Sequence, residues 1–253
     1  MFEVRNEQEE AEVVLYDLIG KHTDWWTGES CGVSAQEFKD ALDSVSPKPV
    51  VLRIDSSGGD VFDAFAMCSA IQRYPGRVRA CVDGLAASAA SYIAVVCDEV
   101  EMNDYAYLMI HCASSQVRGN ARDLEDVAAR LRNIDANLAA IYEKRSNLTV
   151  EQVLDYMADE TWFTASEALE HGLCTGIAET EQRIAACIDP AMARDFRHVP
   201  EGISVRAEQR EPQEEQAPHT VGVEEVEAAS LTILDGRIYG RKEVQDEQQA
   251  TME

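Results

Sequence analysis

The sequence of 253 residues has no long apolar run and few basic residues. Its longest apolar stretch, residues 84–96, contains Ser88, Ser91 and Tyr92 and is too short to span a bilayer. Only 22 Lys and Arg oppose 47 Asp and Glu, a formal net charge of -25, which disfavours binding to nucleic-acid backbones and anionic membranes. The first residues also lack the basic start and apolar core of a signal peptide. We therefore expect neither a nucleic-acid partner nor a membrane.

Motifs for metals and nucleotides are missing as well. No two of the seven cysteines are separated by two residues, which argues against a structural zinc site. Most cysteines lie in apolar runs, so we expect buried, reduced thiols in a cytosolic protein. The sequence has neither a G-x-G-x-x-G stretch nor the Lys-Ser/Thr pair of a phosphate loop. We expect no metal and no organic cofactor.

The hydrophobic pattern predicts an α/β domain. Short apolar runs that end at turn residues predict strands over residues 13–20, 50–54, 78–82 and 106–110. Helical spacing and stop signals predict helices over residues 34–45, 61–74, 84–96, 121–146, 149–156 and 166–171. Ser34 with Glu37 three residues later is typical of a capping box. Alternating strands and helices with short turns favour parallel pairing in the sheet.

The composition divides the chain into three parts. Residues 1–11 are acidic and are expected to form a flexible N-terminus, followed by a folded domain over residues 12–190. We expect an acidic, largely disordered tail over residues 191–253, because its last 53 residues hold 13 acidic and five basic side chains. Only residues 231–234 and 238–239 there are apolar enough to pack, and a short docking strand around Leu231 is the alternative to disorder.

Three features within the domain could carry chemistry. Gly58 and Gly59 follow a strand directly, and such a turn can present free N–H groups to an oxyanion. Ser88 lies in a run of small residues that opens a helix, where positive partial charge favours an alkoxide. His111 ends an apolar strand, a suitable position for a general base. Each feature alone also fits a structural role, namely a tight turn, close helix packing or a buried histidine.

Together these residues resemble a known family. Four blocks occur in the family's order: residues 53–60 (Arg-Ile-Asp-Ser-Ser-Gly-Gly-Asp), 84–88 (Gly-Leu-Ala-Ala-Ser), 109–111 (Met-Ile-His), and 160–168 (Glu-Thr-Trp-Phe-Thr-Ala-Ser-Glu-Ala) with His171-Gly172-Leu173. They resemble the proteolytic subunit of the Clp protease and, more closely, the Clp-type prohead (head maturation) proteases of tailed phages. The resemblance runs from about residue 12 to about 180. It implies the Clp/crotonase fold, with a parallel sheet and repeated β-β-α units.

The resemblance implies a serine peptidase with a Ser-His-acid triad. Ser88 matches the family's nucleophile, His111 its general base, and Glu160 occupies the position of its aspartate. Because glutamate replaces aspartate, Asp159 remains an alternative third member. The implied oxyanion hole consists of the N–H groups of Gly59 and Ala89.

The resemblance also implies partners and a setting. In the family, the long helix after the histidine pairs subunits, so a homo-oligomeric ring is expected. The phage branch implies capsid and scaffold proteins as substrates, in the host cytoplasm within the assembling prohead. A housekeeping peptidase subunit working with an ATP-driven unfoldase is an alternative, as is an inactive assembly protein on the same fold. A signal-peptide-peptidase-type enzyme fits less well, because that class uses a lysine base.

Overall fold

The computed structural model describes residues 1–7, 9–23, 30–178, 187–188, 196–200, 203–205, 232–234 and 237–239. The chain divides into two units, Met1–Glu208 and Gln209–Glu253. Within the second unit, β13 (Thr232–Leu234) and β14 (Arg237–Tyr239) pair as antiparallel strands. The prediction of a disordered tail otherwise concerns residues outside the described ones.

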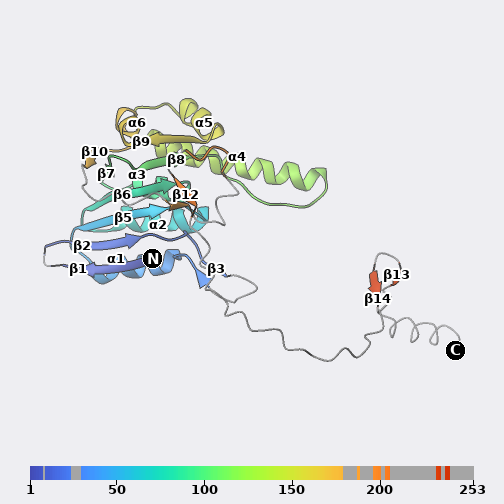
Figure 1. Ribbon diagram of the computed structural model, residues 1–253, viewed down its shortest axis with the longest axis horizontal. Helices are drawn as coiled ribbons and strands as arrows, with labels where there is room; N and C mark the ends of the chain where they lie inside the picture. Colours follow the sequence, from blue (N-terminus) through green and yellow to red (C-terminus); the bar gives the residue numbers. More distant parts are fainter. Residues whose placement is uncertain are drawn as a thin grey trace, which may run out of the picture. The chain divides into compact units, whose positions relative to one another are not determined.

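The first unit is an α/β domain built on one large sheet (Figure 1). Its described strands are β1 (Phe2–Asn6), β2 (Ala11–Leu15), β3 (His22–Thr23), β4 (Ser30–Cys31), β5 (Val50–Ser56), β6 (Val78–Ala87), β7 (Glu99–Asn103), β8 (Tyr107–Ile110), β9 (Thr161–Thr164), β10 (Gly176–Ala178), β11 (Cys187–Ile188) and β12 (Ser204–Val205). Its described helices are α1 (Ala35–Val45), α2 (Val61–Arg73), α3 (Ala89–Val95), α4 (Ala121–Glu143), α5 (Val150–Ala158) and α6 (Ala165–Glu170).

The sheet is mostly parallel. It has eight strands in the order β1-β2-β5-β6-β7-β10, with β8 paired to the far end of β6 and β9 paired to β8. Strands β2, β5, β6, β7 and β10 run parallel, whereas β1 is antiparallel to β2 and β9 to β8. This confirms the predicted mixed α/β class with a mostly parallel sheet.

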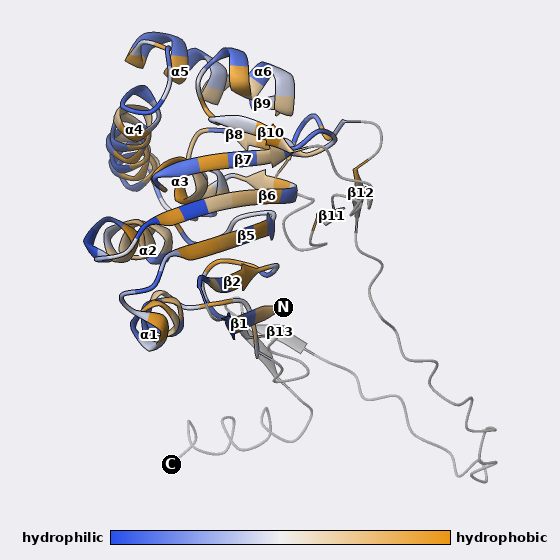
Figure 2. Ribbon diagram, turned by 90° about the vertical axis from the view of Figure 1, so that its left-hand side faces the viewer, coloured by the Kyte–Doolittle hydropathy of each residue, from blue (hydrophilic) through white to orange (hydrophobic). Residues whose placement is uncertain are grey.

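Helices α1, α2 and α3 lie against one face of the sheet (Figure 2). Side chains that alternate along β5 and β6 explain this arrangement, because every second residue points to the helices. Leu52, Ile54, Ala80 and Val82 belong to the buried core on that side. Helix α1 begins at the predicted capping box, in which the Ser34 hydroxyl accepts from the Glu37 N–H.

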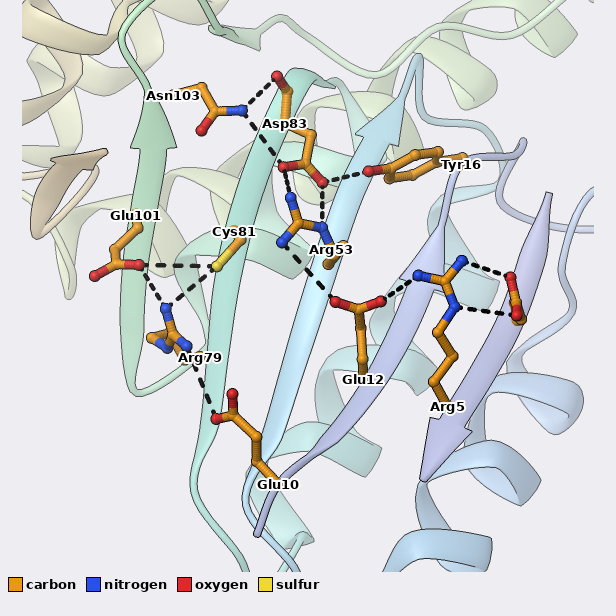
Figure 3. Close-up of polar contacts among 11 residues, drawn as sticks. Arg5, Glu10, Glu12, Tyr16, Arg53, Arg79, Cys81, Asp83, Glu101 and Asn103 are labelled. Carbon is orange, nitrogen blue, oxygen red and sulfur yellow. Dashed lines mark hydrogen bonds and ion pairs between the residues drawn. The ribbon is translucent and has the colours of Figure 1, made fainter. Parts of the chain in front are cut away.

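The other face of the sheet carries a ladder of charged side chains (Figure 3). Arg53 on β5 donates through Nε to the carboxylate of Asp83 at 2.8 Å, and the hydroxyl of Tyr16 donates to the same carboxylate. Arg79 on β6 pairs with Glu101 on β7 at 2.6 Å. Asp83 is almost fully buried, and a buried carboxylate needs partners of this kind to offset the loss of water.

Three predictions about the chain's elements need correction. Residues 1–11 were expected to be flexible, but β1 pairs with β2, and the amino group of Met1 donates to Asp17 at 3.0 Å. The helix expected from residue 84 begins at Ala89, because Gly84–Ala87 continue β6 and pair with β8. Small residues permit either structure, and the neighbouring strands decided between them.

The third correction concerns the end of the domain. A boundary at residue 190 was expected, yet Phe196 is buried and packs with Leu85, Met109 and Ile188. The domain therefore includes chain beyond that boundary. The sequence hides this because Phe196 is a single aromatic residue among charged and polar neighbours.

Candidate active site

Ser88 lies at a sharp turn between β6 and α3. Its φ of 51° is in the left-handed region, which is unusual for a residue other than glycine. The turn is held in place by the Ser88 N–H, which donates to the carbonyl of Met109 at 2.9 Å. Strain of this kind is common at functional positions. The hydroxyl is thereby placed at the end of the strand and the start of the helix.

His111 follows β8 and reaches the same place. Strand β8 runs parallel to the end of β6, with Ala87 opposite Met109, so Ser88 and His111 both follow the carboxyl ends of neighbouring strands. Nε2 of His111 lies 2.7 Å from Oγ of Ser88. That is hydrogen-bond distance, and it is the contact that a serine nucleophile needs with its base.

The segment after His111 is also anchored. The N–H of Cys112 donates to the carbonyl of Met157 at 3.1 Å, and the N–H of Ala113 donates to Asp135 on α4 at 2.7 Å. Burial, reinforced by Asp135, raises the pKa of the Cys112 thiol. This thiol, although next to His111, is therefore held in its protonated, poorly nucleophilic form.

The two glycines approach Ser88 from the end of β5. Gly58 has φ 95°, and a Cβ there would lie only 2.8 Å from the Ala89 nitrogen. Ile19 donates to the Gly58 carbonyl at 2.9 Å and accepts from the Asp60 N–H at 2.8 Å. Gly59 lies between Gly58 and Asp60. Because its two neighbours make the hydrogen bonds to Ile19, the N–H of Gly59 points away from Ile19. The N–H of Ala89 is the first of α3 and has no partner within the helix.

A cavity of about 560 Å³ opens beside these groups. Gly59, Ser88, Ala89 and His111 lie at its wall. Apolar side chains of α4 complete it: Val127, Leu131, Ile134 and Leu138. A mostly apolar hollow beside a nucleophile, a base and two backbone N–H groups is a suitable site for an extended peptide.

The structure places Glu160 near the site but gives it partners other than those expected. It is buried, with φ 53°, and its carboxylate accepts from the N–H of Arg197 at 2.7 Å and of His198 at 2.8 Å. Nε1 of Trp162 donates to it at 3.3 Å. No hydrogen bond joins Glu160 to His111 in the described part of the chain. The Glu160 carboxylate is instead engaged by the backbone N–H groups of Arg197 and His198.

The alternative acid, Asp159, ends α5 with an exposed side chain. Ser91, the other serine of the small-residue run, is fully buried and donates to the Ser88 carbonyl at 2.6 Å. It also shares a hydrogen bond of 2.6 Å with the hydroxyl of Tyr142. Ser91 therefore fixes α3 and α4 together and is not presented to the cavity.

The sequence analysis missed one contact of His111. The ring of Phe196 meets the imidazole edge to face, with centroids 5.8 Å apart at 77°, and meets Trp162 at 5.6 Å and 90°. The one signal was an isolated aromatic residue among polar neighbours. Nothing in its local pattern indicates which element it contacts.

The described residues contain no group of three His, Cys, Asp or Glu side chains that could hold a metal. Among the helices described, none is both long and apolar enough for a membrane span. Five of the described cysteines (Cys68, Cys81, Cys97, Cys112 and Cys174) are buried or half-buried and have a raised pKa because of burial. Cys31 differs from the expectation because it is exposed.

Comparison with known proteins agrees with this geometry. The model of the Clp protease family matches residues 40–181, which is more than half of the chain. The ATP-dependent Clp protease proteolytic subunit of Porphyromonas gingivalis is 30% identical over 145 residues, covering 56% of this chain and 65% of the relative. Proteolytic subunit 2 of Treponema pallidum is 30% identical over 152 residues, covering 58% of this chain and 75% of the relative.

The matched residues contain the Ser88 turn, His111 and the two glycines. The segment around Phe196 lies beyond the matched residues. The family match and the arrangement of a serine, a histidine and an apolar cavity lead to one assignment. The chain belongs to the Clp protease family of serine peptidases.

Proposed function

We propose that this chain is a serine endopeptidase in which Ser88 is the nucleophile and His111 the general base. The observation that carries the proposal is the 2.7 Å contact between Ser88 Oγ and His111 Nε2 at the wall of the apolar cavity. The left-handed turn at Ser88 supports it, because such a turn presents the hydroxyl at the end of the sheet.

The reaction follows from these positions. Oγ of Ser88 attacks the peptide carbonyl carbon while Nε2 of His111 accepts the hydroxyl proton. The N–H groups of Gly59 and Ala89 stabilise the negative oxygen of the tetrahedral intermediate. His111 then returns the proton to the leaving amine, and a water molecule hydrolyses the acyl-enzyme by the same steps. No step requires a metal or an organic cofactor.

A fluorophosphonate probe on the full-length protein tests this assignment. We expect labelling of the wild type, with mass spectrometry locating the phosphonate on Ser88. Ser88→Ala should remove the label, whereas Ser91→Ala, a serine one turn further along α3, should keep it. Labelling that depends on Ser91, or none at all in a folded wild type, would refute the proposal.

For the biological role we propose head maturation in a tailed phage, with scaffold and capsid proteins as substrates. The motif blocks at residues 84–88 and 160–168 and the acidic region after residue 200 support this role. A housekeeping role with an ATP-driven unfoldase is the second candidate, favoured by relatives that are named ATP-dependent proteolytic subunits. Cleavage of scaffold protein without an unfoldase or ATP supports the first role, and ATP-dependent cleavage with an unfoldase supports the second.

We further propose that the subunits assemble through α4. Only Leu138, Ala139 and Tyr142 of this helix are buried, while Leu124 is 46% exposed, and the first part of α4 extends beyond the sheet (Figure 1). An apolar stripe that its own domain does not cover favours a second copy as its partner. Light scattering should report a large oligomer, and Leu124→Glu should reduce its mass.

A further inference from the structure

We propose that residues 196–198 form a support behind the catalytic imidazole, with Phe196 as a positioning residue for His111 and Glu160 as the anchor of the segment. The inference rests on the proposed function, since it assigns His111 the role of base. It assigns Glu160 a role other than the direct contact with the imidazole that the resemblance implies for this residue. Residues 196–198 lie beyond the residues that match the Clp protease family, whereas Glu160 lies within them.

The first step concerns where Phe196 lies. Its side chain is 8% exposed and contacts both His111 and Trp162 edge to face. The cavity wall includes His111 but neither Phe196 nor Trp162. Phe196 therefore packs on the imidazole from outside the cavity, where a bound peptide leaves it in place.

The second step concerns what holds the segment. The buried carboxylate of Glu160 accepts from two consecutive backbone N–H groups, those of Arg197 and His198, at 2.7 and 2.8 Å. The side chains of both residues are exposed, so the main chain alone provides this attachment. Hydrogen bonds from backbone N–H groups to a carboxylate are charge-assisted and are stronger than those between two neutral groups. The attachment thus needs a carboxylate of the right reach at position 160 and no particular side chain at 197 or 198.

The third step explains why a glutamate suits this position. Strand β9 pairs with β8 so that Thr161 lies opposite Ile110, which places Glu160 beside the start of the His111 segment. From there its side chain reaches past Trp162 to the amides of Arg197 and His198. Aspartate is shorter by one carbon–carbon bond, about 1.5 Å, which would take most of these contacts beyond hydrogen-bond distance.

The consequence is an imidazole held from two sides. Ser88 contacts it on the cavity side, and Phe196 limits its movement on the other. Misplacement of a catalytic group by about 1 Å can cost roughly 100-fold in rate. Loss of the support should therefore slow the chemical step and leave binding at the cavity unchanged.

The test measures fluorophosphonate labelling of the full-length protein at several probe concentrations, which separates kinact from KI. Phe196→Ala should lower kinact about 10- to 100-fold with KI unchanged, and Phe196→Leu, which keeps much of the apolar volume, should recover most of the rate. Glu160→Asp should lower kinact more than Glu160→Gln, because the glutamine oxygen still reaches the two amides.

Phe163→Ala is the matched control. Phe163 is buried and meets a different histidine, His171, edge to face with centroids 5.5 Å apart at 72°. The substitution removes the same ring and the same type of contact from the same domain, without touching His111. We expect a loss of thermal stability comparable to that of Phe196→Ala, with kinact at the wild-type value.

Three results would overturn the inference. One is wild-type kinact in Phe196→Ala, and another is an equal loss of kinact in Phe163→Ala and Phe196→Ala. The third is a Glu160→Asp variant with wild-type kinact together with a Glu160→Gln variant whose kinact falls by about 10⁴-fold. A carboxylate of a catalytic triad would behave in this way. A wild type that does not label on Ser88 would instead refute the proposed function, so the two failures are distinguishable.

Discussion

The two sides of the His111 ring differ in how the chain builds them. The cavity side combines Ser88 with Gly59, each of which follows a parallel strand by a few residues at most. The other side combines Glu160 with Phe196, which are 36 positions apart and not joined by strand pairing. Strand order alone brings the first pair together, whereas the second depends on the path of one later segment. The two sides of the ring therefore depend on different parts of the fold.

The largest expected effect lies on the cavity side. Ser88→Ala should reduce peptide hydrolysis by roughly 10⁴-fold or more, because no other group can form the acyl-enzyme. Ser91→Ala should retain most activity and lose some stability, since it removes the hydrogen bond to Tyr142. Steady-state hydrolysis of a fluorogenic peptide measures both. Equal loss of activity in the two variants would contradict the assignment of Ser88 as the nucleophile.

The glycine turn should give the next largest effect. Gly59→Ala should lower kcat about 100- to 1000-fold, because an added Cβ overlaps the Ile19 carbonyl and displaces the N–H assigned to the oxyanion. Gly176→Ala is the control, since a Cβ there meets its nearest atom at 3.8 Å. Full activity in Gly59→Ala would remove that N–H from the mechanism.

Shortening the chain separates the two sides of the ring. A chain ending at residue 208 should keep the activity of the full protein, whereas one ending at residue 190 should lose about 10- to 100-fold in kcat, because it lacks Phe196. Both chains retain Ser88 and His111, so both should react with the fluorophosphonate probe. The chain ending at residue 190 should react more slowly. Equal activity in the two chains would show that the second side is dispensable.

The charged face of the sheet should affect stability without affecting catalysis. Asp83→Asn keeps the shape but removes the charge that Arg53 and Tyr16 contact, at a cost of about 1–2 kcal/mol in the free energy of unfolding. Asp104→Asn, at an exposed position, should cost much less. Urea denaturation with a labelling assay on the same samples checks that kinact stays constant.

The smallest effect is expected at the start of α1. Contacts with Lys21, and with Ser34, lower the pKa of Glu37 to about 2. Because its pKa is lower in the folded state than in the unfolded state, ionised Glu37 stabilises the fold above pH 4.5. This stabilisation is lost as the pH falls toward 2. Glu37 is exposed, so Glu37→Gln should cost under about 0.5 kcal/mol at neutral pH. The difference from the wild type should disappear in unfolding curves at acidic pH.

Sequence patterns were most informative where structure is local. The capping box at Ser34 and the turn glycines after β5 could be predicted because the interacting atoms are a few residues apart. The strands β7 (Glu-Val-Glu-Met-Asn) and β9 (Thr-Trp-Phe-Thr) were missed, because they lack the continuous apolar run on which the other strands were predicted. The start of α3 was misplaced because alanines and glycine fit a strand or a helix equally well.

The sequence by itself determined the α/β class, the turn residues, and the candidate nucleophile and base, because each depends on local composition and on strand order. Only the tertiary structure decided that Ser88 and His111 lie 2.7 Å apart and that Glu160 accepts from the amides of residues 197 and 198. It also decided that Phe196 belongs to the domain core. The physical reason is that backbone amides and apolar packing carry no residue-specific pattern, so their partners emerge only when distant segments are folded together.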